Sequence, residues 1–425
     1  MMKAYPEYKE SGINWLGEVP SHWLLSKNKF LAKFTKGKNP TELHDDKAPS
    51  LYPYLAMDFL RGKNNSPKYA HLEKSSYLVK DGQNLIIWDG SNAGEFVVGK
   101  EGILSSTMAA GELSNKVTAK FYKYLTTIIE KEMRRLTVGM GIPHVDGSEL
   151  NNLSLPLPES FQEQEKIADY LDVEVGRVDN LISEKENFIK LLSEKRQALI
   201  SHVVTKGLNP NVPMKDSSSK WNTELPKEWK EVQFRRVVHL SQGLQIAQTE
   251  RLETNESGSL EYITIKSINA GESSTVKEYV VPPSDRVICS KNDVLMARTG
   301  ATGQVVTGVE GVFHNNFFKV SFNQKIDKTY LVYLLSIKEL KEHLLLLAGT
   351  TTIPDLNHGD FLGTRIPLPS IEEQTEIVNK LNAELSKINA LNTEVLKSIA
   401  LLKEHRIALI SAAVTGKVDV REEVK

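Results

Sequence analysis

The amino-acid sequence predicts an α+β protein with two mixed α/β domains, which are related by an internal repeat and separated by two long helices that pair as an antiparallel coiled coil. Three observations lead to this fold class. The helix-end sequence KRQALISHVVT at 195–205 returns as HRIALISAAVT at 405–415. Each copy closes a stretch whose apolar residues recur every seven positions. Each stretch follows about 150 residues of short Val-, Ile-, Tyr- and Phe-rich runs bounded by turn residues.

The repeat extends over most of the chain. Gln164 in LPLPESFQEQEKI matches Gln374 in IPLPSIEEQTEI, and Arg196 matches Arg406, so both pairs lie 210 residues apart. An unchanged offset indicates a continuous helix without insertions. Closer to the start of each half, WLGEVPSHW returns as WNTELPKEW, and NLIIWDGSNAGEFVVG pairs with DVLMARTGATGQVVTG. The anchors are shared while the loops between them differ, which indicates one scaffold that presents two different surfaces.

These anchors divide the chain into five segments. We predict a first variable domain at 1–157, a long helix at 158–206, a second variable domain at 207–368, a second long helix at 369–415 and a tail at 416–425. Within the domains, EYITIKSI, DVLMA and FFKVSF are typical of strands. KFYKYLTTIIEKEMRRL and DKTYLVYLLSIKELKEHLLLL have helical spacing, so each variable domain mixes helices with strands.

Each long helix carries an apolar seam. Its positions at seven-residue steps are Leu171, Val178, Lys185, Leu192 and Leu199 in the first helix, and Leu381, Ile388, Val395, Leu402 and Leu409 in the second. The polar seam residues Lys185 and Asn392 either fix the register or mark a locally exposed seam, and the sequence leaves both interpretations open. If the seams pack antiparallel, a pseudo-twofold axis relates the variable domains. Such a pair suits duplex DNA with two half-sites roughly 34 Å, or one helical turn, apart.

Composition bounds the class of protein. With 425 residues, 40% of them hydrophobic and 25% charged, the chain can form two or three domains. No signal-peptide pattern or membrane-length apolar run occurs, so we expect a cytoplasmic protein without a membrane partner. The lone Cys289 excludes a disulfide framework and a Cys-rich zinc site, and is typical of a small buried hydrophobe.

The repeated motifs carry a family resemblance. The chain resembles a specificity subunit of a type I restriction-modification system in three motifs, each present twice: the PLP...EQ...I entry into a long helix, the R-x-A-L-I-S...VT helix end and the W...P-x-x-W start of each half. The resemblance implies that each variable domain is a target recognition domain that reads one half of a split DNA site. It also implies that the paired helices set the spacing and dock two methyltransferase subunits, joined by restriction endonuclease subunits.

The same resemblance assigns the chemistry to the partners. Adenine methylation and DNA cleavage would belong to those subunits, as would S-adenosylmethionine, ATP and Mg, so we expect no cofactor in this chain. Besides the seam residues, the motif residues Gln164, Arg196, Gln374 and Arg406 are predicted to serve the coiled coil or partner binding.

Polar loops that follow predicted strands supply the candidates for DNA contact. Gln is a bidentate reader of adenine and basic residues bind phosphates or guanine, although a solvated side chain remains the alternative for any single residue. The candidates are Lys36, Lys38, Trp88, Asn92 and Met140 in the first half, and Gln242, Gln245, Arg298, Thr302, Thr350, Thr351 and Thr352 in the second. In this alignment Arg298 stands opposite Asp89, so a role for the arginine cannot be copied between the halves.

Charge gives weak support for nucleic-acid binding. The net charge is −1, although residues 1–157 carry 20 basic and 17 acidic residues. We therefore expect local phosphate contacts, with further electrostatic affinity supplied by a partner.

Motifs for catalysis are missing. The sequence contains no phosphate-binding G-x-x-x-x-G-K-[ST] loop, no Asn-Pro-Pro-aromatic motif and no H-E-x-x-H pair, so we predict neither catalytic nor metal-binding residues. His144 and His358 are interpreted as structural. The alternatives are an autonomous DNA-modifying enzyme with an unrecognised site, and a coiled-coil scaffold without DNA affinity.

Overall fold

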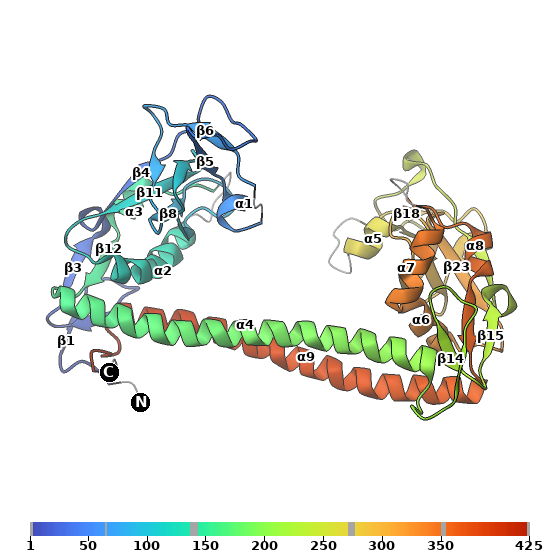
Figure 1. The fold of residues 1–425 in the computed structure, drawn as a ribbon. Helices are drawn as coiled ribbons and strands as arrows, with labels where there is room; N and C mark the ends of the chain where they lie inside the picture. The colour runs from blue at the N-terminus through green and yellow to red at the C-terminus, as the bar shows by residue number, and fades with distance from the viewer. Residues whose placement is uncertain (1–2, 64–65, 137–142, 271–276, 350–353, 423–425) are drawn as a thin grey trace. The chain divides into compact units, whose positions relative to one another are not determined.

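The computed structural model describes residues 3–63, 66–136, 143–270, 277–349 and 354–422. The chain folds as two compact units (Figure 1): unit 1 comprises Met1–Glu186 with Lys397–Lys425, and unit 2 comprises Asn187–Leu396. Both unit boundaries fall inside the long helices. Each unit therefore combines one variable domain with a part of each helix.

Unit 1 holds the first variable domain. Its elements are β1 (Tyr8–Glu10), β2 (Glu18–Pro20), β3 (Leu24–Lys27), β4 (Ala32–Lys36), β5 (Leu51–Leu55), α1 (Met57–Leu60), β6 (Tyr69–His71), β7 (Leu78–Val79), β8 (Asn84–Ile87), β9 (Phe96–Val98), β10 (Gly102–Leu104), β11 (Met108–Leu113), α2 (Ala119–Leu136), α3 (Gly147–Asn152) and β12 (Ser154–Leu157), with a 3₁₀ turn at Asn28–Phe30.

Unit 2 repeats this order. Its elements are β13 (Met214–Asp216), β14 (Glu224–Pro226), β15 (Lys230–Gln233), β16 (Val238–Gln242), β17 (Leu260–Ile263), α5 (Ile265–Ala270), β18 (Tyr279–Val280), β19 (Ile288–Cys289), β20 (Val294–Ala297), β21 (Val305–Thr307), β22 (Gly311–Phe313), β23 (Phe317–Phe322), α6 (Lys328–Ser336), α7 (Lys338–Leu347), α8 (His358–Gly363) and β24 (Arg365–Leu368), with 3₁₀ turns at Phe234–Arg236, Gln248–Glu250 and Asp285–Val287.

The sheets of the two domains have the same topology. One four-stranded sheet has the order β4-β11-β8-β9 in unit 1 and β16-β23-β20-β21 in unit 2. The other has the order β6-β5-β10-β7 and β18-β17-β22-β19, and in each the central pair is parallel. This agreement confirms that the internal repeat is a repeat of fold, with mixed helices and strands in each half.

The helical segment that follows β11 in unit 1 and β23 in unit 2 differs between the domains. In unit 1, α2 is a single helix that packs on the core through Phe121, Leu125 and Ile129. In unit 2 the equivalent segment breaks at Ile337, whose backbone is extended, and forms α6 and α7. The sequence pattern predicted continuous helical spacing here. The apolar period continues through Ile337, although the helix is interrupted at that residue.

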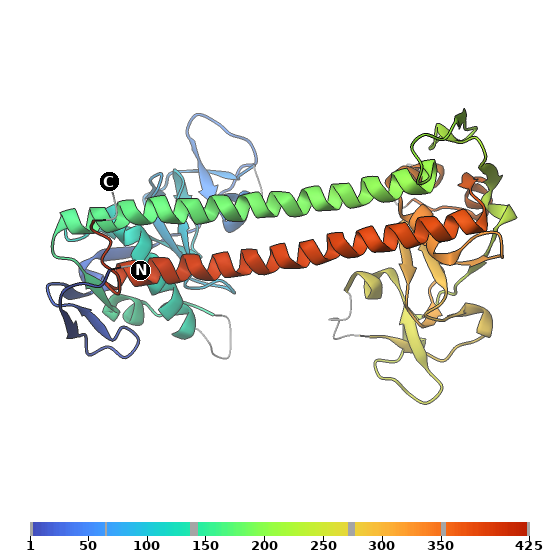
Figure 2. The same cartoon turned by 90° about the horizontal axis from the view of Figure 1, so that it is seen from below.

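The two long helices are α4 (Phe161–Lys206) and α9 (Ile371–Val414). In unit 1 the first part of α4 and the last part of α9 run antiparallel, with Arg406 paired to Asp179 at 2.8 Å and Lys403 to Glu186 at 3.4 Å. Their buried seam combines Leu171 of α4 with Leu409 of α9. Figure 2 shows the helices side by side here.

In unit 2 the last part of α4 and the first part of α9 are likewise antiparallel, since Arg196 donates a hydrogen bond to Asn389 and apolar residues of both helices share one core. The seam residues Leu192, Leu381 and Ile388 are buried there. The predicted antiparallel pairing of the helices is thereby confirmed within each unit.

Burial along the seam is uneven. Val178 is buried, whereas Lys185, Leu199, Val395 and Leu402 are partly exposed. Asn392 is also partly exposed. Of the two interpretations of the polar seam residues, a locally exposed seam describes their surroundings, and no hydrogen bond from either side chain to another described residue supports a register-fixing contact.

A buried glutamine joins each domain to its long helix. In unit 1, Oε1 of Gln164 accepts a hydrogen bond from the backbone N–H of Thr118 at 2.8 Å, and Nε2 donates to the carbonyls of Lys116 and Pro158. Gln164 has no exposed surface. Its amide therefore ties the residues before α2 to the first turn of α4.

Unit 2 makes the same contact. Gln374 accepts from the N–H of Asp327 at 2.7 Å and donates to the carbonyls of Lys325 and Pro369. We name this pair of contacts the glutamine clamps. Gln164 and Gln374 were predicted to serve the coiled coil or partner binding; that interpretation was wrong, because all their polar atoms bind the chain's own backbone inside a unit.

The residue before each glutamine holds a tryptophan. The indole N–H of Trp23 donates to Glu163 at 3.0 Å, and that of Trp229 donates to Glu373 at 2.9 Å. Both tryptophans are buried. The distant W...P-x-x-W and E-Q motifs thus form one junction in each unit.

Replacement of Gln164 by Leu should lower the free energy of unfolding of unit 1 by about 2–4 kcal/mol, since it removes a fully buried amide and leaves one part-buried N–H and two carbonyls without partners. Urea unfolding of the full chain measures this change. The matched control is Gln162→Leu, because Gln162 is exposed two residues earlier in the same helix. Equal stability of the two variants would contradict the clamp.

Candidate nucleic-acid interface

Four segments of each domain meet at one end of the sheet that contains β8 or β20. The backbone N–H of Trp88 donates to the carbonyl of Thr107, and the N–H of Arg298 donates to that of Asn316. The carbonyl of Trp88 accepts from Val145, and that of Arg298 accepts from Leu356. Trp88 and Arg298 are therefore structural equivalents.

This equivalence corrects the alignment made from sequence, which placed Asp89 opposite Arg298. The β-bridges agree with the correction, because Asp89 pairs with His144 and Thr299 pairs with Asp355. The turn before β9 is one residue longer than the turn before β21, which moved the alignment by one position.

Glycines keep the two turns alike. Gly90 has φ 105° and Gly300 has φ 82°, and these left-handed values are ones that side chains with a Cβ rarely adopt. The turns also pack on helices, where a Cβ at Gly303 would lie 2.9 Å from Cγ of Lys341. The backbone of this end of the sheet is thus fixed independently of the side chains that it presents.

Equivalent positions carry different side chains. We name this set of four positions the reading set: Lys36, Trp88, Asp89 and His144 in the first variable domain, and Gln242, Arg298, Thr299 and Asp355 in the second. Lys36 and Gln242 are each the last residue of β4 or β16, which lies beyond β11 or β23 in the same sheet. Every position in the set differs between the two domains.

In the first variable domain the reading set contains an exposed ion pair. Nζ of Lys36 lies 2.7 Å from Oδ2 of Asp89, with side chains 45% and 36% exposed. An ion pair this exposed contributes little stability, typically below about 1 kcal/mol. Either side chain can therefore give up the other and bind a ligand at little cost in stability.

In the second variable domain Arg298 is held more firmly. Its Nη2 donates to Oδ2 of Asp355 at 2.6 Å, and the hydroxyl of Thr299 donates to Oδ1 of the same carboxylate at 2.6 Å. The guanidinium lies 5.4 Å from the ring centroid of Phe318 and the side chain is 16% exposed. Nε is buried without a hydrogen-bond partner among the described residues.

His358 adds to this environment without adding charge. It packs on Phe318 with ring centroids 4.5 Å apart. Burial and the nearby Arg298 lower the pKa of His358, so at neutral pH the imidazole is uncharged. Arg298 thus carries the positive charge of this cluster.

The other predicted DNA contacts differ in accessibility. Lys38, Gln242 and Gln245 are exposed, and Asn92 is partly exposed. Thr302 is 7% exposed, and its hydroxyl donates to the carbonyls of Arg298 and Pro354. It therefore holds the turn and has no free hydroxyl hydrogen. Four predicted residues lie outside the described residues: Met140, Thr350, Thr351 and Thr352.

Sequence reasoning did not single out Asp355. It interpreted His144 as structural, and the structure places its backbone in a bridge with Asp89. The available signal was the I-P dipeptide shared by VGMGIPHV and AGTTTIPDL, because the residue that follows it in each half faces the turn after β8 or β20.

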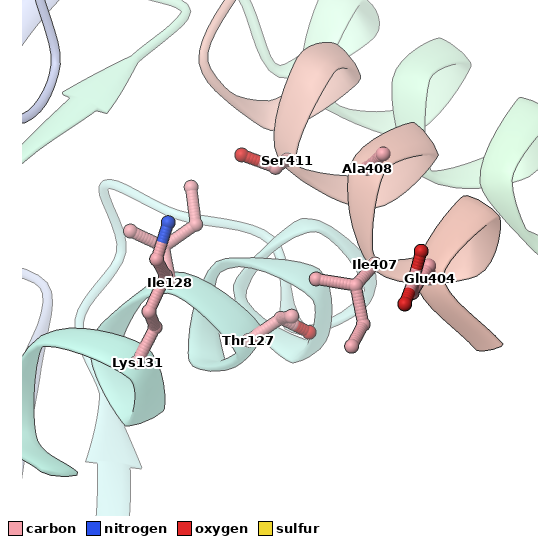
Figure 3. Close-up of a pocket in the computed structure, with 7 residues that line it drawn as sticks. All are labelled: Thr127, Ile128, Lys131, Glu404, Ile407, Ala408 and Ser411. Carbon is pink, nitrogen blue, oxygen red and sulfur yellow. The ribbon is translucent and has the colours of Figure 1, made fainter. Parts of the chain in front are cut away.

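The described part of the chain contains a cavity next to the long helix α9. Among the described residues no three His, Cys, Asp or Glu side chains are grouped as metal ligands. A cavity of about 310 Å³ lies between α2 and α9 in unit 1, lined by Ile128, Ile407 and other side chains (Figure 3). Lys131 and Glu404 are the charged residues that line it. No helix in the described part is long and apolar enough to cross a membrane.

Fold and interface together define a two-domain protein in which one scaffold carries two different reading sets. The family model described as "Type I restriction modification DNA specificity domain" matches residues 20–191 and 226–401. The chain belongs to this family. The two matched regions coincide with the two halves of the repeat.

Relatives and solved structures agree with this assignment. The chain is 28% identical to the type I restriction enzyme MjaVIII specificity subunit of Methanocaldococcus jannaschii, over 99% of this chain and 98% of that protein. It is 22% identical to the EcoBI specificity subunit of Escherichia coli, over 97% and 89%.

A chain from a structure of complex assembly and conformational transition in the type I R-M system has a TM-score of 0.68 at 19% identity, over 93% of this chain and 98% of that chain. The HsdS subunit from Thermoanaerobacter tengcongensis has a TM-score of 0.50 at 19% identity, over 96% and 100%. At these identities the two structures support the fold.

Cys289 should not react with a thiol reagent in the folded protein. The residue is 1% exposed, and burial raises the pKa of its thiol to about 11, so the reactive thiolate is scarce at pH 8. Titration with Ellman's reagent should detect no fast-reacting thiol before urea is added and one thiol afterwards. Immediate reaction of the native chain would contradict the burial of β19 in the core of unit 2.

Proposed function

We propose that this chain is the DNA sequence-specificity subunit of a type I restriction-modification complex and that each variable domain reads one half of a bipartite site. One observation carries the proposal. The backbone hydrogen bonds of Trp88 and Arg298 and the bridges that follow them are the same in both domains, while all four side chains of the reading set differ. A fixed frame with variable polar side chains is what recognition of two unrelated half-sites requires.

Other subunits of the system would supply the chemistry. We propose that methyltransferase subunits, one for each half of the repeat, dock on the long helices, and that restriction endonuclease subunits join them. S-adenosylmethionine, ATP and Mg would bind those subunits, in the cytoplasm where the DNA lies. A non-catalytic role for this chain agrees with the naming of its relatives as specificity subunits.

Exposed apolar side chains on the helices support docking. In unit 1, Leu181 and Leu401 are 46% and 65% exposed, and in unit 2, Leu191 and Leu396 are each 51% exposed. These large apolar side chains are open to a partner that covers the helices.

Deletion of the gene from its host, followed by single-molecule sequencing of DNA methylation, tests the proposal. We expect one split adenine-methylated motif to disappear and all other methylated motifs to remain, because the partners need this chain to find their site. Restoring the gene should restore the motif. A methylome that is unchanged although the chain is expressed with its methyltransferase partner would contradict the proposed function.

A further inference from the structure

We infer that Arg298 reads a guanine in the half-site bound by the second variable domain and that Asp355 is the positioning residue that holds its guanidinium in place. The inference rests on the proposed function and specifies which base one residue recognises. It starts from the only strongly restrained cation of the two reading sets.

The Arg298–Asp355 pair is not required for folding this part of a domain. At the equivalent positions the first variable domain has Trp88 and His144. The backbone of Trp88 makes the same hydrogen bonds as that of Arg298, without any ion pair between these two positions. The residue that packs against the guanidinium also differs between the domains: Phe318 of the second domain corresponds to Ala109 of the first in the strand registers. These coupled differences suit a change of ligand better than a change of fold.

The geometry leaves one edge of the guanidinium for a ligand. Asp355 engages Nη2, and Thr299 occupies the other oxygen of that carboxylate. Nε is buried, while Nη1 donates to no described residue. The end that carries Nη1 and Nη2 has the two parallel donors that match O6 and N7 of guanine in the major groove.

The conformational restraint on the Arg298 side chain favours a contact with a base over a contact with a phosphate. A phosphate contact needs only positive charge, which a flexible lysine such as the exposed Lys38 supplies. A planar fork that is held by a carboxylate and packed on an aromatic ring loses little conformational freedom when it binds. Arg298 has both restraints. Gln242, the last residue of β16, pairs with Phe318 in the strand register, at the same end of the sheet.

The first variable domain would read a different base at its equivalent position. Its reading set has Lys36 in an exposed ion pair with Asp89, and lysine is a point charge without a fork. Strong arginine-type selection of guanine is therefore expected in one half-site only.

The test uses the chain assembled with its methyltransferase partner and a set of duplexes that carry the wild-type motif with every single-base replacement. Methylation rates give the base preference at each position. Arg298→Gln should lower the preference for guanine at one position of one half-site by about 5- to 150-fold, while the preferences at all other positions stay. Asp355→Asn should weaken the preference at that same position, because the amide cannot hold the guanidinium as the carboxylate does.

Arg365→Gln is the matched control, since it removes the same charge from an exposed strand residue at the base of the same domain and should leave every preference unchanged. A merely structural Arg298 would lower thermal stability and weaken methylation of all duplexes alike. That outcome, or full retention of every base preference, would overturn the inference.

If the Arg298→Gln chain does not assemble with its methyltransferase partner, the Arg298→Lys and Asp355→Asn variants provide the test. Loss of guanine preference at one position supports the inference, and its retention in both overturns it. Failure of the wild-type complex to prefer any bipartite motif would instead overturn the proposed function, and the inference with it.

Discussion

The glutamine clamps are the contacts on which the rest of the structure depends. Each clamp satisfies three backbone groups with one buried amide, and it does so where a variable domain meets the first turn of a long helix. A buried amide that is fully paired tolerates few other arrangements, because any shift leaves a polar group without a partner. The tryptophan bound by the preceding glutamate adds a second fixed point. Each domain is thereby oriented on its own part of the helices.

Above this junction, the fold separates what must stay constant from what may vary. The sheets keep their order, and the turns after β8 and β20 keep their glycines and the backbone hydrogen bonds of Trp88 and Arg298. The four side chains presented there take part in few contacts that the fold requires, as the absence of an Arg–Asp pair from the first domain demonstrates. Such a division allows recognition to change without loss of stability, since the substitutions fall outside the buried core.

Much of this architecture was predictable from the sequence. A constant spacing of 210 residues between matched positions indicated continuous helices, and the seven-residue period located the seam that is buried at Leu171 and Leu381. Side-chain roles at the junction were not predictable, because a glutamine in a helix pattern gives no sign of whether it faces a partner or its own backbone. The pairing of Arg298 with Asp355 was hidden for another reason: the residues are far apart in sequence, and a turn of different length displaced the alignment by one position.

The central claim is that each variable domain reads its half-site independently on a common scaffold. The most direct measurement is the methylated motif of a chain in which residues 23–156 replace residues 229–367, joined at matched anchors so that both glutamine clamps are kept. Because the helix parts run antiparallel within each unit, the account predicts a motif with two inverted copies of the first half-site. A motif that still contains the second half-site, or a folded and assembled complex that methylates no split motif, would contradict it.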